Sequence, residues 1–185
     1  MEEKFDVLDE NGLHTNKIES RQHCHEYGLY HKAVVLFIIN SNNEVLLQKR
    51  SSNKKLWPDM WDISAGGHVL AGEYGFEAVL REAREELGID DIKRENMLFL
   101  ESCISHIKKG NIIDNMLNEY YIIYKDLNIK DLTLQTEEVS EVKWFKVEEI
   151  SKMLDDGYRE ITSKIGVWDT LITFMNKNIE NKKQI

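Results

Sequence analysis

The sequence predicts an α+β fold with a mixed β-sheet, in one domain that spans residues 1–185. The chain has 185 residues, which is enough for one well-packed core and too few for two. Apolar runs typical of strands and amphipathic runs typical of helices follow one another without a regular strand–helix–strand repeat. That order favours mixed layers of helix and sheet over a doubly wound parallel sheet.

We expect three parts along this domain: an N-terminal arm at residues 1–30, a core at 31–155, and a C-terminal helix and tail at 156–185. In the arm, residues 4–9 alternate weakly between polar and apolar and precede the turn signal Asn11-Gly12. The arm is therefore expected to form a short hairpin.

The core begins with the longest apolar run of the chain, Ala33 to Ile39, which predicts a buried strand. A polar turn follows, and residues 44–49 predict a partner strand. Residues 51–61 predict an irregular loop with large aromatic side chains, and residues 64–68 predict a glycine turn.

A helix is expected next, because residues 75–87 place apolar side chains at helical spacing. Gly88 follows in the position where glycine commonly ends a helix. The elements expected downstream are strands at 97–106, 117–125 and Trp144–Phe145, and helices at 147–155 and 161–177.

Composition excludes several classes of protein. Acidic residues outnumber basic ones by 33 to 24, so the formal net charge is −9. This balance disfavours a general nucleic-acid binder, because the mean field repels phosphate backbones. The apolar runs fall far short of the roughly 20 residues that span a bilayer, the acidic start resembles no signal peptide, and Cys24 and Cys103 are too few for a disulfide framework. We therefore expect a cytoplasmic protein without a membrane partner.

Three carboxylates share one side of the helix expected at 75–87. At about 100° per residue, Glu82, Glu85 and Glu86 occupy an arc of about 100° that is separate from the apolar stripe. Such a group repels itself, and it stands in the last turn, where the helix dipole disfavours negative charge. The residues leave two interpretations, a solvated acidic face or a site for hard divalent cations. The pair Gly66-Gly67 favours the cation site, because glycine lets backbone carbonyls approach closely.

Residues 67–89 resemble the Nudix box at every specified position. The box reads Gly, five residues, Glu, seven residues, then Arg-Glu-apolar-any-Glu-Glu-any-Gly-apolar. The matching residues are Gly67, Glu73, Arg81, Glu82, Ala83, Glu85, Glu86, Gly88 and Ile89. The resemblance implies the Nudix fold, an α/β/α sandwich with a mixed β-sheet. It also implies hydrolysis of a nucleoside diphosphate linked to another moiety, or of a related small diphosphate, with Mg²⁺ or Mn²⁺.

The same resemblance implies roles within the box. The residues that match the family's metal ligands are Glu82, Glu85, Glu86 and the carbonyl of Gly67. Glu85 is also the expected activator of the attacking water, while Glu73 and Arg81 match a pair that holds the loop against the helix. These roles agree with the chemistry, because a divalent ion neutralises diphosphate charge and lowers the pKa of a bound water.

A second resemblance, outside the box, is to the isopentenyl-diphosphate isomerase branch of the family. It is carried by residues 44–61, 64–68 and Asn118-Glu119. The resemblance implies that Arg50 and Lys54 bind the diphosphate of the substrate, a role that suits an arginine fork and a lysine point charge.

Two departures separate this chain from the isomerase. The isomerase needs a cysteine in the glycine turn, where this chain has Ala65 and Gly66, and neither can move a proton. The isomerase also has two carboxylates spaced two residues apart on this strand. The second matches Glu119, but the position of the first is Leu117 in this chain. We therefore expect an isomerase-like scaffold that carries the metal site of a hydrolase.

The histidines support two different expectations. His31 and His68 are expected to line the substrate site. In the isomerase, histidines near these two help to bind a second type of metal, and the position of their upstream partner falls near Cys24, between His23 and His25. Whether the histidines bind a metal in this chain stays open.

Two alternative functions also stay open, an isomerase-like enzyme and a non-catalytic Nudix sensor that binds a nucleotide. Glu119 is the expected catalytic residue outside the box, with Glu137, Glu138 and Glu141 as further candidates for a base. The expected partner is a small substrate that contains a diphosphate, and nucleic acid is not expected. A homodimer through the N-terminal arm or the last helix is possible.

Overall fold

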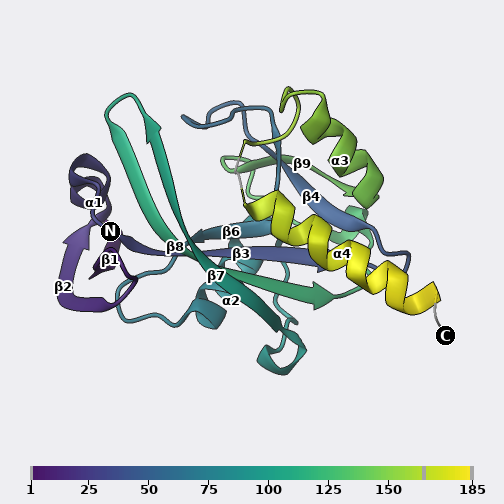
Figure 1. The fold of residues 1–185 in the computed structure, drawn as a ribbon, viewed down its shortest axis with the longest axis horizontal. Coiled ribbons are helices and arrows are strands. Elements are labelled where there is room, and N and C mark those ends of the chain that lie inside the picture. Colours follow the sequence, from purple (N-terminus) through teal and green to yellow (C-terminus); the bar gives the residue numbers. More distant parts are fainter. Residues whose placement is uncertain (1, 164–165, 184–185) are drawn as a thin grey trace. The chain divides into compact units, whose positions relative to one another are not determined.

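A computed structural model describes residues 2–163 and 166–183 (Figure 1). The chain divides into two compact units, and each is described by itself. The first unit comprises the residues up to Leu36 together with Ala65–Ile123. The second comprises Phe37–Ser64 and the residues from Tyr124 onward. Strand β3, His31–Ile39, begins in the first unit and ends in the second.

The N-terminal arm of the first unit is a hairpin followed by a short helix. Strands β1, Lys4–Leu8, and β2, His14–Ser20, pair antiparallel, as expected from the turn signal between them. Helix α1, Arg21–Tyr27, packs against both strands and was not predicted. It begins where the Ser20 hydroxyl accepts the His23 N–H at 3.2 Å. Because α1 has seven residues and buries only one of them, it leaves no amphipathic pattern in the sequence.

The strands of the first unit lie in the order β6-β3-β8-β7, with the last two forming a long antiparallel hairpin (Figure 1). Their bounds are Ala65–His68 for β6, Leu98–Lys109 for β7 and Ile112–Tyr124 for β8. The prediction of a glycine turn at 64–68 was wrong, because Gly66 and Gly67 pair with Val35 and Val34 of β3. Glycine there serves close packing within a strand rather than a change of direction.

Helix α2, Gly75–Leu87, has the predicted bounds. Its apolar stripe is buried through Ala78, Val79, Ala83 and Leu87. The helix ends at Gly88, which adopts the left-handed conformation with φ 71° and donates its N–H to the Arg84 carbonyl at 3.0 Å.

Replacing Gly88 with alanine is expected to destabilise the protein by about 1 kcal/mol, because a Cβ is disfavoured at that positive φ. Urea unfolding followed by circular dichroism measures the change. Alanine at Glu95, an exposed position in the 3₁₀ helix Arg94–Asn96, serves as a surface control and should shift stability by less than about 0.5 kcal/mol. Equal stability of Gly88→Ala and wild type would contradict the capping role.

The second unit combines three antiparallel strand pairings with two helices. The end of β3 pairs with β4, and β4 also pairs with β5 and β9. The bounds are Val45–Arg50 for β4, Trp61–Asp62 for β5, Val139–Phe145 for β9, Val147–Asp155 for α3 and Val167–Lys183 for α4, with a 3₁₀ helix at Ile129–Asp131.

The last helix starts later than the predicted range of 161–177. Residues 160–162 are held extended, because the Trp61 N–H donates to the Glu160 carbonyl at 2.8 Å and the Thr162 N–H donates to the Trp61 carbonyl at 2.9 Å. The predicted helix began at Ile161, but Ile161 instead forms a parallel bridge with Trp61. Within the described residues, no helix has both the length and the apolar composition needed to cross a bilayer.

Candidate active site

The three box glutamates on α2 have different surroundings. Glu86 is buried and accepts the Gly66 N–H at 3.0 Å, so it ties the helix to β6. The Glu82 side chain is 13% exposed, and its burial raises the pKa of its carboxyl. Glu85 is 48% exposed and is the most accessible of the three. Of the three carboxylates that the sequence places on one side of the helix, those of Glu82 and Glu86 are thus held by protein contacts, and that of Glu85 is open to solvent.

Arg81 is the centre of the hydrogen-bond network beside these carboxylates. Its guanidinium binds both oxygens of Glu73 at 2.9 Å and donates to the His68 carbonyl at 2.8 Å. It also contacts Glu82 at 2.6 Å and Glu85 at 3.4 Å. Burial alone would lower the pKa of Arg81, but the hydrogen bonds to Glu73 and the charge of Glu82 outweigh it and raise the pKa. The expected pairing of Glu73 with Arg81 is therefore present in the structure.

Two glycines let charged side chains approach the backbone closely. A Cβ at Gly67 would overlap the Glu82 carboxylate, and a Cβ at Gly75 would overlap the Glu119 carboxylate. The absence of a side chain at these positions brings Glu82 against β6 and Glu119 against the start of α2.

Glu119 lies on β8 and already has two partners. Its carboxylate pairs with Lys32 on β3 at 3.0 Å and accepts the Tyr121 hydroxyl at 2.8 Å. Burial, followed by the neighbouring Glu119, raises the pKa of Tyr121, so the hydroxyl keeps its proton and donates it. Lys32 and Tyr121 were missed from the sequence, although the spacing of Glu119 and Tyr121 on one strand already places them on one face.

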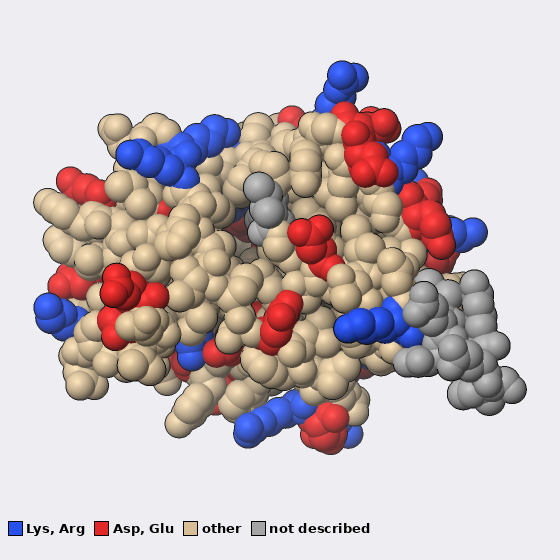
Figure 2. Space-filling model, viewed as in Figure 1, with Lys and Arg blue, Asp and Glu red and all other residues tan. Residues whose placement is uncertain are grey.

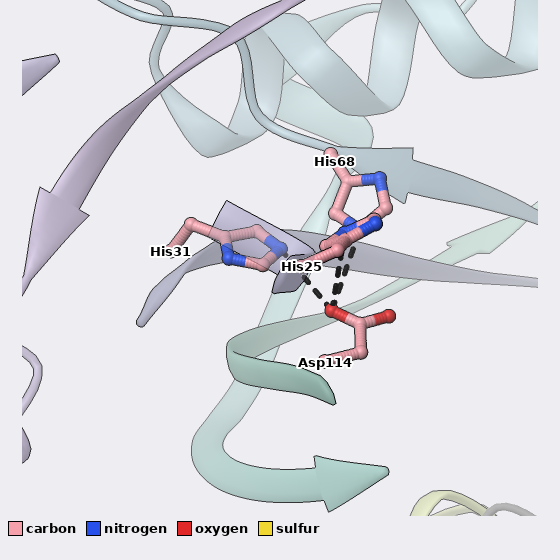
Figure 3. A group of neighbouring side chains, drawn as sticks. All are labelled: His25, His31, His68 and Asp114. Atoms are coloured by element: carbon pink, nitrogen blue, oxygen red, sulfur yellow. Dashed lines mark ion pairs between the residues drawn. The ribbon is translucent and has the colours of Figure 1, made fainter. Parts of the chain in front are cut away.

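A second group of polar side chains gathers around one carboxylate oxygen. The Nε2 atoms of His31, His25 and His68 lie 3.2, 3.5 and 3.7 Å from Oδ1 of Asp114 (Figure 3). Burial lowers the pKa of His25 to about 4, and it also lowers that of His68. Burial of Asp114 acts to raise its pKa, but the nearby imidazoles of His31 and His68 outweigh it and hold the pKa well below its usual range.

The structure thus places His31 and His68 in a buried cluster rather than on open surface. His31 is fully buried, so in this conformation a substrate has no direct access to its side chain. Their expected role in substrate binding stays a prediction. Sequence reasoning missed Asp114 entirely, because an aspartate in a strand without a neighbouring ligand motif carries no signal.

Arg50 and Lys54 lie in the second unit and are both engaged in ion pairs. Arg50 donates to Asp62 at 3.0 Å and to the Leu56 carbonyl at 3.0 Å. Lys54 pairs with Glu138, one of the candidate bases. A diphosphate that binds Arg50 and Lys54, as predicted, must therefore either displace the carboxylates of Asp62 and Glu138 or bind beside them.

Charged side chains of both signs are interspersed on the face that Figure 2 shows. Among the described residues visible on that face, lysines and arginines are separated by acidic and uncharged residues and form no continuous basic surface. This mixture of signs on the visible face agrees with the net charge of −9.

Comparison with known proteins decides the family. The NUDIX domain family matches residues 29–165, which is most of the chain. This chain belongs to the Nudix family. The matched range contains the complete Nudix box, with its carboxylates, its arginine and its two glycines in the arrangement described above.

Relatives of the chain are Nudix hydrolases. It is 38% identical over 159 residues to Nudix hydrolase 3 of Arabidopsis thaliana, covering 83% of this chain but only 20% of that protein. The chain thus spans about a fifth of the length of that relative. It is also 35% identical to an uncharacterized Nudix hydrolase of Listeria innocua, covering 84% of this chain and 86% of the other. The prediction that the chain is a Nudix hydrolase is confirmed at this level.

Solved structures show the same fold. A Deinococcus radiodurans protein superposes with a TM-score of 0.69 at 22% identity, over 95% of this chain and 98% of the other. The MutT protein of Methanosarcina mazei Go1 superposes with a TM-score of 0.58 at 24% identity, over 83% and 96%. The predicted α+β class and Nudix fold are confirmed.

The residues of the Nudix box fit a divalent cation. Glu73, Glu82 and Glu85 share the guanidinium of Arg81, and Glu86 on the same helix accepts the Gly66 N–H, so the box carries an excess of negative charge that a hard cation would offset. The backbone at Gly67 lies directly against the Glu82 carboxylate, because a Cβ there would overlap it.

Gly67→Ala tests this close approach. The added methyl must displace the Glu82 carboxylate, so we expect kcat/KM for a diphosphate substrate to fall about 100-fold, while unfolding stability falls by about 1–3 kcal/mol. Gly110→Ala, whose methyl would meet open space but whose φ of 59° disfavours a Cβ, is the control for a backbone cost without a clash and should keep full activity. Full activity of Gly67→Ala would show that the Glu82 position is not critical.

Proposed function

We propose that this chain hydrolyses a diphosphate linkage in a nucleoside diphosphate joined to another group, or in a related small diphosphate. Water attacks phosphorus, and Mg²⁺ or Mn²⁺ is the cofactor. The observation that carries the proposal is the meeting of Glu82, Glu85 and the Gly67 backbone beside the Glu73–Arg81 pair.

Each side chain has a separate task in this proposal. Glu82, Glu85, Glu86 and the Gly67 carbonyl hold the ion, which when bound neutralises diphosphate charge and lowers the pKa of a water. Glu85 is the residue best placed to take the proton of that water, because it is the most exposed of the three box glutamates on the helix and its contact to Arg81 is long, at 3.4 Å.

Arg81 and Glu73 act by positioning. Arg81 joins the His68 carbonyl at the end of β6 to Glu82 on the helix, and the Glu73 carboxylate also accepts the Leu70 N–H at 2.9 Å. These contacts fix the loop between β6 and α2, so the Gly67 carbonyl and the glutamates keep a constant separation.

Glu119 is proposed as a further site residue near the start of α2. Its contacts to Lys32 and Tyr121 fix the carboxylate and suit it to orient a substrate or water rather than to move freely. Glu137, Glu138 and Glu141, which lie in the second unit, enter the proposal only as alternatives for a base.

Proteins of similar fold suggest which compounds to test as substrates. The Nudix domain of Shewanella oneidensis NrtR was solved with ADP-ribose, at a TM-score of 0.56 and 15% identity over 75% of this chain and 84% of the other. A Caenorhabditis elegans Ap4A hydrolase superposes at 0.53 and 20% identity, over 79% and 98%. These likenesses extend to the fold alone, and they place ADP-ribose and dinucleoside polyphosphates among the compounds to test.

A hydrolysis screen tests the proposal. Nucleoside triphosphates, ADP-ribose, nucleotide sugars, dinucleoside polyphosphates and prenyl diphosphates are each incubated with Mg²⁺ or Mn²⁺, and phosphate-containing products are separated. We expect metal-dependent cleavage of at least one nucleotide. Binding of a nucleotide without turnover would favour a sensor, and double-bond migration in a prenyl diphosphate would favour an isomerase.

A further inference from the structure

Strand β7 forms one edge of the sheet, and most of its residues are exposed. It pairs with β8 along one side, and among the described residues no strand pairs with its other side (Figure 1). None of its twelve residues is buried, and eight of them are exposed. An edge of this kind presents backbone N–H and C=O groups that can pair with a further strand.

The part of β7 best suited to further pairing is the stretch Glu101–Lys109. Over these nine residues β7 pairs with β8 without a shift in register. A register shift between Phe99 and Glu101 ends the regular stretch, and irregularities of this kind commonly end strand pairing. The central residue of the regular stretch is therefore Ser105.

The charged side chains of this stretch lie at its two ends. Glu101 is at one end, Lys108 and Lys109 are at the other, and all three are exposed. Lysine on an edge strand usually opposes pairing with another chain. Here the same strand carries the opposite charge at its far end. Because antiparallel pairing of two identical strands brings opposite ends together, the stretch is complementary in charge to a second copy of itself.

We propose that β7 pairs antiparallel with β7 of a second copy of this chain, about a two-fold axis at Ser105. Glu101 of each copy then lies opposite Lys109 of the other, so the dimer contains two ion pairs. Directly opposite residues of an antiparallel pair project on the same face, with Cβ atoms about 4.5–5.5 Å apart, which is within reach of an ion pair. The two sheets become one continuous sheet.

Apolar side chains support the same register. Cys103 of each copy lies opposite Ile107 of the other, and both side chains are only half-buried in the single chain. Ile104, on the other face of the strand, is 37% exposed and lies opposite His106. Pairing removes part of this apolar surface from water, a contribution that salt does not screen.

The proposed interface lies away from the Nudix box. The box contacts β6, where Gly66 donates its N–H to Glu86 and Gly67 lies against Glu82. In the sheet order β6-β3-β8-β7, two strands separate β6 from β7. Pairing through β7 therefore leaves the box carboxylates uncovered, and the dimer does not depend on the proposed hydrolysis.

Sedimentation velocity of the full chain, over a wide range of concentration and at low and high salt, tests for the dimer. We expect a monomer–dimer equilibrium whose Kd rises with salt, because the ion pairs are exposed. Hydrogen exchange measured above and below Kd locates the interface. The amides of residues 101–109 should exchange more slowly in the dimer, because the pairing protects them.

Charge reversal tests the register. In Lys109→Glu two attractive pairs become repulsive, so we expect Kd to rise about 10-fold or more. Combining Lys109→Glu with Glu101→Lys restores opposite charges and should return Kd to within about threefold of wild type. Lys108→Glu is the matched control, because it changes the net charge equally but lies opposite Ser102, and its Kd should change by less than about threefold. All three positions are exposed, so circular dichroism should show that each variant folds.

Three results would overturn the proposal. The first is a chain that stays monomeric over the whole concentration range. The second is a dimer whose protected amides lie in the N-terminal arm or in α4 instead of β7. The third is an equal effect of Lys109→Glu and Lys108→Glu, with no recovery in the double variant. No measurement here uses turnover, so these outcomes are separate from a failure of the hydrolase proposal.

Discussion

Glu85→Gln is expected to lower kcat about 10³-fold or more on whichever diphosphate the chain hydrolyses. The amide keeps the size of the side chain but removes both the negative charge that holds a divalent ion and the basic oxygen that takes a proton from water. Steady-state kinetics at saturating Mg²⁺ measure the loss.

The fold should survive this change. Glu85 is 48% exposed and its contact to Arg81 is long, at 3.4 Å, so unfolding stability without metal should stay within about 0.5 kcal/mol of wild type. Glu95→Gln, at the exposed 3₁₀ helix of the same unit, is the matched control and should keep full turnover. Unchanged kcat in Glu85→Gln would remove Glu85 from the mechanism.

Arg81→Ala is expected to have the largest effect on stability, a loss of about 3 kcal/mol or more. The variant leaves Glu73 and Glu82 largely buried, at 15% and 13% exposure, without the guanidinium that both contact. Urea unfolding in the presence of a chelator measures the effect. Added Mg²⁺ should recover part of the loss, because the ion supplies positive charge to the same carboxylates.

Arg81→Lys is the informative companion. Lysine keeps the charge but cannot bind both oxygens of Glu73 and reach the His68 carbonyl at the same time. Its stability should fall between wild type and Arg81→Ala, and its kcat/KM should fall because the loop is less well held. If Arg81→Ala unfolds within 1 kcal/mol of wild type, the guanidinium is not the organising group of the loop.

Much of the candidate active site could be predicted because its information is local. Helix α2 was expected at its observed bounds, and the pairing of Glu73 with Arg81 was expected from the box. The metal-binding and catalytic roles of Glu82, Glu85 and Glu86 stay predictions, as do the single-domain organisation and the cytoplasmic location.

The errors arose where contacts between distant segments override local pattern. The glycines at 66 and 67 suggested a turn, but pairing with β3 makes them part of a strand. The start of the last helix was expected at 161, but pairing with Trp61 holds that segment extended. Short α1 gave no signal, since its single buried side chain leaves no period to detect.

Apolar residues recur in α2 with the period of a helix, so the sequence alone determined the helix and its acidic face. Residues 67–89 match a specific motif, so the sequence alone also determined the family and the expected chemistry. The gathering of His25, His31, His68 and Asp114 was decided only by the tertiary structure. These four residues come from a helix and three strands spread over about half of the chain, and no local period links them. Only strand pairing and the docking of the N-terminal arm bring their side chains to one point.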